Sequence, residues 1–278
     1  MRKKKKRFNK NSIPFLLLAV IHLGMFLLLL KRKKQKDTWI LLLSNIGFAY
    51  LFEYLVLNLF HGYRYKPSIM KKRAFDSVLG AIFSQAIYVP ITATFLTLLN
   101  KNWKWKISFS LFYYCIENLF LRLNIYKVYW WRPIYTVVLL NVYFNISDAF
   151  YKALSAQKRW AMVIAHYLAI QVVWSTLLYV SAMKRYIRFG RGHFHTWTEH
   201  FKIVPLYSLI LSFIALITSS KAGLSYRMPL PLSHIIIDIT LVRMGILKVN
   251  TNQFIFACSR YLLMTFISRF FYKKIYKE

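Results

Sequence analysis

The sequence predicts an all-α membrane protein, a polytopic bundle of eight or nine transmembrane helices. Hydrophobic residues make up 58% of the 278 residues and aromatic residues 18%, and the mean hydropathy is +0.39. A soluble domain of this length cannot bury so much apolar surface, so lipid must cover part of it. Long apolar runs also recur along the whole chain, with short basic segments between them, which is typical of spans joined by loops.

The first apolar run, 12–30, follows a basic segment as it would in a secretory signal. It is nevertheless long enough to cross the membrane, since about 20 apolar residues suffice. It also ends in the basic run 31–34 rather than in a small-residue cleavage site. We therefore interpret it as an uncleaved signal anchor.

The same length criterion of about 20 apolar residues, applied along the whole chain, predicts nine spans. The eighth is short and carries Asp238 and Arg243, so an interfacial or buried helix is the alternative there. No soluble domain fits between spans, so residues 1–278 form one integral membrane domain. The predicted spans lie near 12–30, 38–60, 77–99, 107–124, 133–153, 160–183, 203–219, 232–247 and 252–271.

The formal charge of +32 first raises the possibility of a nucleic-acid binder. The basic residues, however, mostly lie between apolar runs, which favours loops held at anionic lipid head groups over nucleic acid. With nine spans, the N-terminal side carries 22 Lys and Arg and the other side 16. This excess predicts a cytoplasmic N-terminus, unless the first segment is re-entrant or interfacial and leaves both flanking basic clusters on the cytoplasmic side.

Four of the eight acidic residues fall inside predicted spans: Glu53, Glu117, Asp148 and Asp238. A charge at the bilayer centre costs about 2.5–3.5 kcal/mol even on the lenient insertion scale. One interpretation is structural, with each carboxylate paired to a cation and locking helices together. The other is functional, with the acids lining a polar pathway or a binding site.

Two of these acids begin closely similar segments, 117–128 and 238–249. In both, an arginine follows the acid by five residues, and Lys-Val ends the segment. A weaker copy begins at Glu53, with Asn58 in place of the arginine. All three acids lie on even-numbered spans, so the pattern predicts parallel repetition of a two-span unit.

A spacing of five residues places Glu117 and Arg122 about 140° apart around a helix, so they cannot pair well with each other. The same holds for Asp238 and Arg243. We therefore predict that Glu117 or Asp238 pairs with Arg122 or Arg243 across a helix interface.

Aromatic and basic residues crowd the start of the fifth predicted span and are typical of a membrane-interface belt. A stacking or cation–π pocket for a lipid head group is the alternative. Trp103 and Trp105, interleaved with Lys101, Lys104 and Lys106, are interpreted in the same way. The first cluster comprises Tyr126, Tyr129, Trp130, Trp131 and Arg132.

The segment 193–200 contains three histidines and Glu199. His195 and Glu199 would share a helix face, but no His-Glu-x-x-His sequence is present and the neighbours are basic. A hydrated amphipathic loop is the better interpretation, so we predict no metal. His166, inside the sixth predicted span, is interpreted as a helix–helix hydrogen bond rather than a proton relay.

The sequence contains no phosphate-binding Gly-rich loop, no nucleophile elbow and no paired-aspartate motif. We therefore predict no catalytic residues and no cofactor. Asp76, Gln85 and Pro90, with the aromatic cluster 126–135, resemble uncharacterised multi-pass membrane proteins of Bacillus- and Clostridium-type Gram-positive bacteria. The resemblance covers roughly residues 38–145 and implies a bacterial cytoplasmic membrane, without an activity.

Three functions are consistent with the sequence. The first is a non-enzymatic integral membrane protein that is structural or interacts with anionic lipid. The second is a transporter, which requires the four intramembrane acids to converge on one cavity. The third is a lipid-modifying membrane enzyme, which requires at least three polar groups to converge beneath a lipid-accessible cleft.

Overall fold

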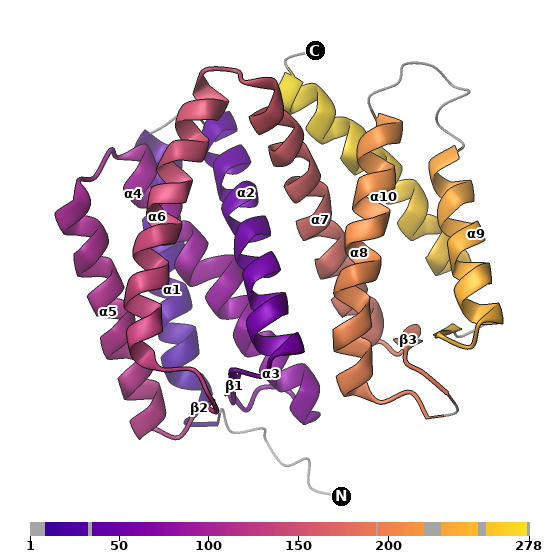
Figure 1. The fold of residues 1–278 in the computed structure, drawn as a ribbon, viewed down its shortest axis with the longest axis horizontal. Coiled ribbons are helices and arrows are strands. Elements are labelled where there is room, and N and C mark those ends of the chain that lie inside the picture. The colour runs from indigo at the N-terminus through magenta and orange to yellow at the C-terminus, as the bar shows by residue number, and fades with distance from the viewer. Residues whose placement is uncertain (1–8, 33–34, 193, 220–228, 250–253, 277–278) are drawn as a thin grey trace, which may run out of the picture. The chain divides into compact units, whose positions relative to one another are not determined.

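The computed structural model describes residues 9–32, 35–192, 194–219, 229–249 and 254–276. These residues form helices and two short strand ladders, which fits the predicted all-α class (Figure 1). They make two compact units. Unit 1 takes in the chain as far as Thr38 and again from Ala49 to Tyr151, and unit 2 takes in Trp39–Phe48 and the chain from Lys152 onward.

Unit 1 is a helical bundle with a two-stranded antiparallel ladder at one end. The ladder pairs β1 with β2, with Tyr63 opposite Val128 and Tyr65 opposite Tyr126. Two stretches, η1 and η2, are π-helical, a form found mostly as short bulges and often at functional sites. The elements are α1 (Ser12–Arg32), α2 (Gln35–Glu53, whose middle belongs to unit 2), η1 (Tyr54–Leu59), β1 (Tyr63–Tyr65), α3 (Arg73–Ile82), η2 (Phe83–Tyr88), α4 (Val89–Leu98), α5 (Trp103–Arg122), β2 (Tyr126–Val128) and α6 (Pro133–Ser155).

Unit 2 has a ladder of the same kind. Strand β3 pairs antiparallel with β4, with Ile187 opposite Val249 and Phe189 opposite Leu247. Its helices pack on one another through α7, which contacts both α8 and α10. The elements are α7 (Arg159–Met183), β3 (Ile187–Phe189), α8 (Trp197–Ser219), α9 (Pro229–Arg243), β4 (Leu247–Val249) and α10 (Phe254–Tyr276).

The order of elements in unit 2 repeats the order in unit 1 from α2 onward. In each, a long helix leads into the first strand, two helices follow, and the second strand precedes the last helix. Glu117 on α5 and Asp238 on α9 hold equivalent places before the second strand. Glu53 does not, because it lies on the helix before the first strand. The repeating unit is therefore longer than the predicted two-span unit.

The turn between helix and second strand is also repeated. Asn124 and Gly245 both have a positive φ, of 58° and 69°. Asn and Gly adopt this left-handed conformation most readily, and it ends a helix by turning the chain away from the helix axis. After each turn the next residue's carbonyl, of Ile125 or Ile246, accepts a backbone hydrogen bond from the residue following the first strand. Both ladders are thus built by the same local backbone geometry.

Aromatic side chains fill the core of unit 1 beneath its ladder. Phe15 from α1 lies with its ring centroid 4.7 Å from Phe120 and 6.3 Å from Tyr65. On the ladder, Tyr63 and Tyr126 lie 5.3 Å apart between ring centroids. Such tilted and edge-on pairs add to the free energy that burial of their surface contributes.

The predicted count of eight or nine spans is not supported. Among the described residues, five helical segments are long and apolar enough to cross a membrane: Ser12–Arg32, Lys36–Leu59, Arg73–Leu98, Arg159–Met183 and Trp197–Ser219. The other four predicted spans are helical, as α5, α6, α9 and α10. Polar and charged residues dilute α5, α6 and α10, and only 15 residues of α9 are described. Run length alone overestimated how apolar α5, α6 and α10 are, and the described part of α9 is shorter than a spanning helix.

Gly80 is required where α3 packs against β1. A Cβ atom at this position would lie 2.3 Å from the Cβ of Tyr65. We expect Gly80→Ala to lower the free energy of unfolding by about 1–3 kcal/mol, because the strand and helix must separate to admit the methyl group. Thermal melting in detergent measures this. Gly24→Ala is the matched control, since nothing lies within 4 Å of its Cβ position; an equal loss in both variants would contradict the explanation.

Candidate functional site

The first polar cluster of unit 1 surrounds Glu53, at the end of α2. The Tyr63 hydroxyl donates a hydrogen bond of 2.5 Å to Glu53 Oε2, and Gln85 Nε2 donates one of 2.9 Å to the same oxygen. Glu53 is only 5% exposed. Its Oε1 is buried and has no hydrogen-bond partner among the described residues. The carboxyl group thus joins α2, β1 and η2 without a cation.

Glu117 contributes a second carboxyl group to the same end of unit 1. The Thr136 hydroxyl at the start of α6 donates a hydrogen bond to Glu117 Oε2. Trp131 Nε1 in turn donates to the Thr136 hydroxyl over 3.2 Å. Because Glu117 lies near the end of α5, these bonds fasten the end of one helix to the beginning of the next.

Three tyrosines of the ladder lie between these carboxyl groups. Burial raises the pKa of Tyr63, Tyr65 and Tyr126 well above the ordinary value, and the negative charge of Glu53 raises each further. The phenols therefore stay protonated at physiological pH and act as hydrogen-bond donors. Their rings pack against one another, with centroids 5.1–5.5 Å apart. The cluster thus sets protonated phenols around two carboxyl groups, each of which has one buried oxygen, Oε1, without a hydrogen-bond partner among the described residues.

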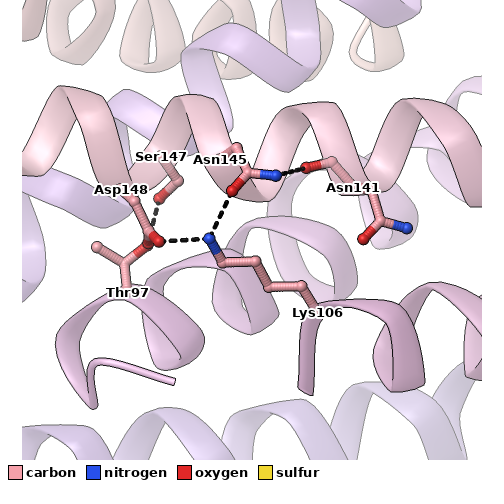
Figure 2. A network of polar contacts seen from close by, with 6 residues as sticks. All are labelled: Thr97, Lys106, Asn141, Asn145, Ser147 and Asp148. Carbon is pink, nitrogen blue, oxygen red and sulfur yellow. Dashed lines mark hydrogen bonds and ion pairs between the residues drawn. The ribbon is translucent and has the colours of Figure 1, made fainter. Parts of the chain in front are cut away.

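The second polar cluster of unit 1 lies at the other end of α5 and α6 and is shown in Figure 2. Lys106 Nζ contacts Asp148 Oδ2 at 2.5 Å and Asn145 Oδ1 at 2.7 Å. The Thr97 hydroxyl, from α4, donates to Asp148 Oδ1 over 2.6 Å. Lys106 is 7% exposed. Three helices are thus joined by one buried ion pair and its hydrogen bonds.

The two clusters of unit 1 are well separated. Thr136 and Asp148 lie twelve residues apart on α6, which corresponds to about 18 Å at 1.5 Å per residue. Glu117 and Lys106 are correspondingly spaced on α5, so the two helices run antiparallel, as Figure 1 shows. The acids of unit 1 therefore do not meet at one point.

The acid of unit 2, Asp238, lies between α8 and α10. The hydroxyls of Tyr207 and Tyr261 donate hydrogen bonds to its two oxygens. Arg260 Nη2 lies 3.8 Å from Asp238 Oδ2 and donates to the Tyr261 hydroxyl over 3.1 Å. The Arg260 guanidinium also lies 5.9 Å from the centroid of the Trp174 ring.

The predicted partners of the acids differ from those observed. In the described part of the chain, the two ion pairs are Lys106–Asp148 and Arg260–Asp238. Arg122 and Arg243 are exposed at the ends of α5 and α9 instead. A basic residue in the last turn is favourable at a helix C-terminus, which explains their place without a carboxylate.

The aromatic cluster predicted at the membrane interface divides in two. Tyr129, Trp130 and Arg132 are exposed. Tyr126 and Trp131, in contrast, are buried in the core of unit 1. Alternation along β2 turns Tyr126 inward and Lys127 outward. The prediction that Tyr126 and Trp131 lie at the membrane interface is therefore corrected. Lys106, predicted at the interface with Trp103 and Trp105, is likewise buried.

Three histidines of unit 2, His166, His195 and His200, bond to backbone groups. His195 is buried, and its two ring nitrogens contact the carbonyls of Arg188 and Gly245 at 3.1 and 3.0 Å. His200 Nδ1 accepts a bond of 3.0 Å from the backbone N–H of Phe189. The prediction that His195 and His200 lie in a hydrated loop is thus corrected, because both side chains are buried. His193 lies outside the described residues. His166 Nε2 contacts the Ser268 carbonyl of α10 at 2.8 Å, which confirms the predicted helix–helix contact.

No metal centre is present among the residues that the structure describes: none of their His, Cys, Asp and Glu side chains gather in a group of three or more. The backbone of the loop after β1 is held by Asp76 instead, whose carboxylate accepts N–H bonds from Ser68, Ile69 and Met70. The sequence did not single out Asp76 as a site residue of its own, although its position in the first turn of α3 is typical of such a cap.

Comparisons with known proteins identify no relatives. No family model matches the chain, and neither a curated protein nor a solved structure is significantly similar to it. Any function must therefore be proposed from the geometry of these clusters.

Proposed function

We propose that the chain is a non-enzymatic integral membrane protein whose intramembrane carboxyl groups fasten its helices, and whose basic segments hold anionic lipid. One observation carries the proposal: each of the four acids accepts a bond from another helix or strand. Glu53 is bonded from β1 and η2, Glu117 from α6, Asp148 from α4 and α5, and Asp238 from α8 and α10.

Bonds between a carboxyl group and a neighbouring helix are energetically favourable inside a membrane. Lipid cannot hydrogen-bond a polar side chain, so an acid there is stable only with a partner on a neighbouring helix. Asp148 and Asp238 have cations, and Glu53 and Glu117 have hydroxyl or amide donors. The distance of about 18 Å along α6 between the two clusters of unit 1 also favours separate fasteners over one converging site.

We further propose that α5, α6, α9 and α10 cross the membrane as well, which gives nine crossings. Their outward faces carry apolar side chains at helical spacing, as expected of a surface covered by lipid. Nine crossings place both ladders on the N-terminal side, where the positive-inside rule puts the cytoplasm of a bacterium. The exposed apolar residues of α6 and α9 include Ile134, Val138, Leu139, Val142, Ile146, Leu232, Ile236, Ile239 and Val242.

A flux measurement tests the non-transporting role. The purified chain would be reconstituted into liposomes that enclose a pH-sensitive dye, with a potassium gradient and valinomycin to drive protons. We expect proton entry no faster than in empty liposomes. Faster proton entry would overturn the proposal if Glu53→Gln or Glu117→Gln abolishes it. The variant must also have the same melting temperature as the parent chain.

The second candidate is proton transport through unit 1, and one observation favours it. Lys106, Ser110 and Tyr113 are buried polar residues on one face of α5, and half-buried Glu117 continues the same face. Midway, the Tyr113 hydroxyl lies 2.9 Å from His22 Nε2 on α1 and 2.8 Å from the Thr92 hydroxyl on α4. This face of α5 therefore runs from the Lys106–Asp148 cluster to the cluster around Glu53 and Glu117.

The same liposomes distinguish the two candidates. Transport along α5 predicts that Tyr113→Phe removes proton entry, because the hydroxyl is the only hydrogen-bonding group of this side chain. Fastening predicts no flux in either protein and a lower melting temperature for Tyr113→Phe, whose His22 and Thr92 partners lose a bond. Loss of flux without loss of stability would establish transport.

A further inference from the structure

Each ladder presents one arginine and one lysine directly opposite each other. In unit 1 Arg64 is paired in register with Lys127, and in unit 2 Arg188 is paired with Lys248. Alternation along the strands turns these residues away from the buried face, which the neighbouring tyrosines and aliphatic residues form. Arg64 and Arg188 are half-buried, and both lysines are exposed.

Two cations opposite each other across a ladder repel, and such a pair is destabilising by itself. The two units nevertheless have the same pair at the same place, although the inward residues change from Tyr63, Tyr65 and Tyr126 to Ile187, Phe189 and Leu247. The opposed cations are common to both ladders, as is the valine that ends the second strand (Val128 or Val249), whereas the other inward residues differ. An anion bound between the two cations would remove this repulsion.

In the described part of unit 1, no carboxylate lies within ion-pair distance of either cation. Within the described residues, Arg64 and Lys127 take part in no ion pair, and the Lys127 ammonium lies 5.1 Å from the centroid of the Tyr129 ring. In unit 2 the Arg188 guanidinium lies over the Trp197 ring at 4.7 Å, and its Nε is buried without a hydrogen-bond partner. An arginine fixed on an aromatic face with an unused N–H is preorganised for an acceptor.

With the crossings proposed above, the ladders lie at the level where phosphate groups are found in a membrane. Strand β1 begins four residues after η1 ends, and β2 begins four residues after α5 ends. Exposed Tyr129 and Trp130 flank β2, as aromatic residues do at a bilayer interface. A short ladder at the ends of membrane helices therefore meets the head groups.

We infer that each ladder binds one phosphate group of an anionic lipid between its opposed arginine and lysine. The guanidinium would donate two parallel N–H bonds to phosphate oxygens and the ammonium a third, the geometry that arginine favours. This inference rests on the proposed function, since it assumes a membrane-embedded chain that binds anionic lipid. Beyond that function, we infer where the lipid binds, which groups bind its phosphate, and that each unit has one such site.

Native mass spectrometry of the full chain tests this, with phosphatidylglycerol added to the detergent-solubilised protein. We expect two lipids retained at low lipid concentration. Arg64→Gln with Lys127→Gln should remove one, as should Arg188→Gln with Lys248→Gln, each with about tenfold weaker binding at the altered ladder. Lys101→Gln with Lys104→Gln is the control, because it removes the same charge at the start of α5, the opposite end of that helix from the unit 1 ladder.

Each further result supports or overturns the inference. Equal losses in the control and ladder variants would overturn the sites while leaving anionic-lipid binding in place. No retained phosphatidylglycerol in the parent chain would overturn both the sites and the lipid part of the proposed function. Equal retention of zwitterionic phosphatidylcholine would overturn the requirement for an anionic lipid. Displacement of the lipid by millimolar inorganic phosphate would assign the sites to free phosphate.

Discussion

Replacing Asp148 with Leu should be among the most damaging single changes in unit 1. Among the described residues, it removes the one carboxylate in contact with Lys106 and leaves the buried ammonium with Asn145 as its hydrogen-bond partner. Breaking a buried ion pair from one side costs about 3–5 kcal/mol. Equilibrium unfolding in mixed micelles measures this loss. Lys106→Met should cost less, because Asp148 is 27% exposed and keeps its bond from Thr97.

The double variant separates the ion pair from the rest of the cluster. Lys106→Met with Asp148→Leu removes both charges, and such replacements are often neutral or stabilising. We expect most of the lost free energy of unfolding to be recovered. Lys104→Met, on the exposed face of the same helix, should change it by less than about 0.5 kcal/mol. If the two single effects simply add in the double variant, Lys106 and Asp148 are not coupled and this account of the cluster fails.

Asp238→Leu should destabilise unit 2 to a similar extent. It leaves the Arg260 guanidinium, which is 4% exposed, without a counter-ion. It also leaves the Tyr207 and Tyr261 hydroxyls without their acceptor. The expected loss is about 3–5 kcal/mol, seen as a lower melting temperature in detergent.

The arginines of the same region provide the comparison for unit 2. Arg260→Met should cost less than Asp238→Leu, because Asp238 keeps two tyrosine donors. Arg243→Met, at the exposed end of α9, should have almost no effect. A larger loss from Arg243→Met than from Arg260→Met would restore Arg243 as the partner of an intramembrane acid.

The sequence revealed the acids but not their partners. An acid inside an apolar run is visible because its cost is high and its neighbours are apolar. Its partner is a hydroxyl, amide or lysine from another element, such as Tyr63, Gln85 or Lys106, and only the folded chain brings the two together. Lys106 was especially hard to predict, because the neighbouring Lys101 and Lys104, interleaved with tryptophans, are typical of a membrane interface.

The ladders were also beyond sequence patterns. Three residues such as Tyr-Arg-Tyr or Leu-Lys-Val are too short for alternation to indicate a strand. The matched segments 117–128 and 238–249 did carry the signal of repetition, since they contain equivalent helix ends, turns and second strands. The rest of the repeating unit is hidden, because lipid-facing and core positions accept many apolar residues.

The four acids together provide the most direct test of the account. We would measure the melting temperature, in detergent, of a chain carrying Glu53→Leu, Glu117→Leu, Asp148→Leu and Asp238→Leu. Fastening predicts that this chain does not accumulate as a folded protein, since the summed loss approaches the total of about 5–15 kcal/mol that stabilises a typical protein. A quadruple variant that folds and melts within a few degrees of the parent would contradict the claim that these carboxyl groups hold the helices together.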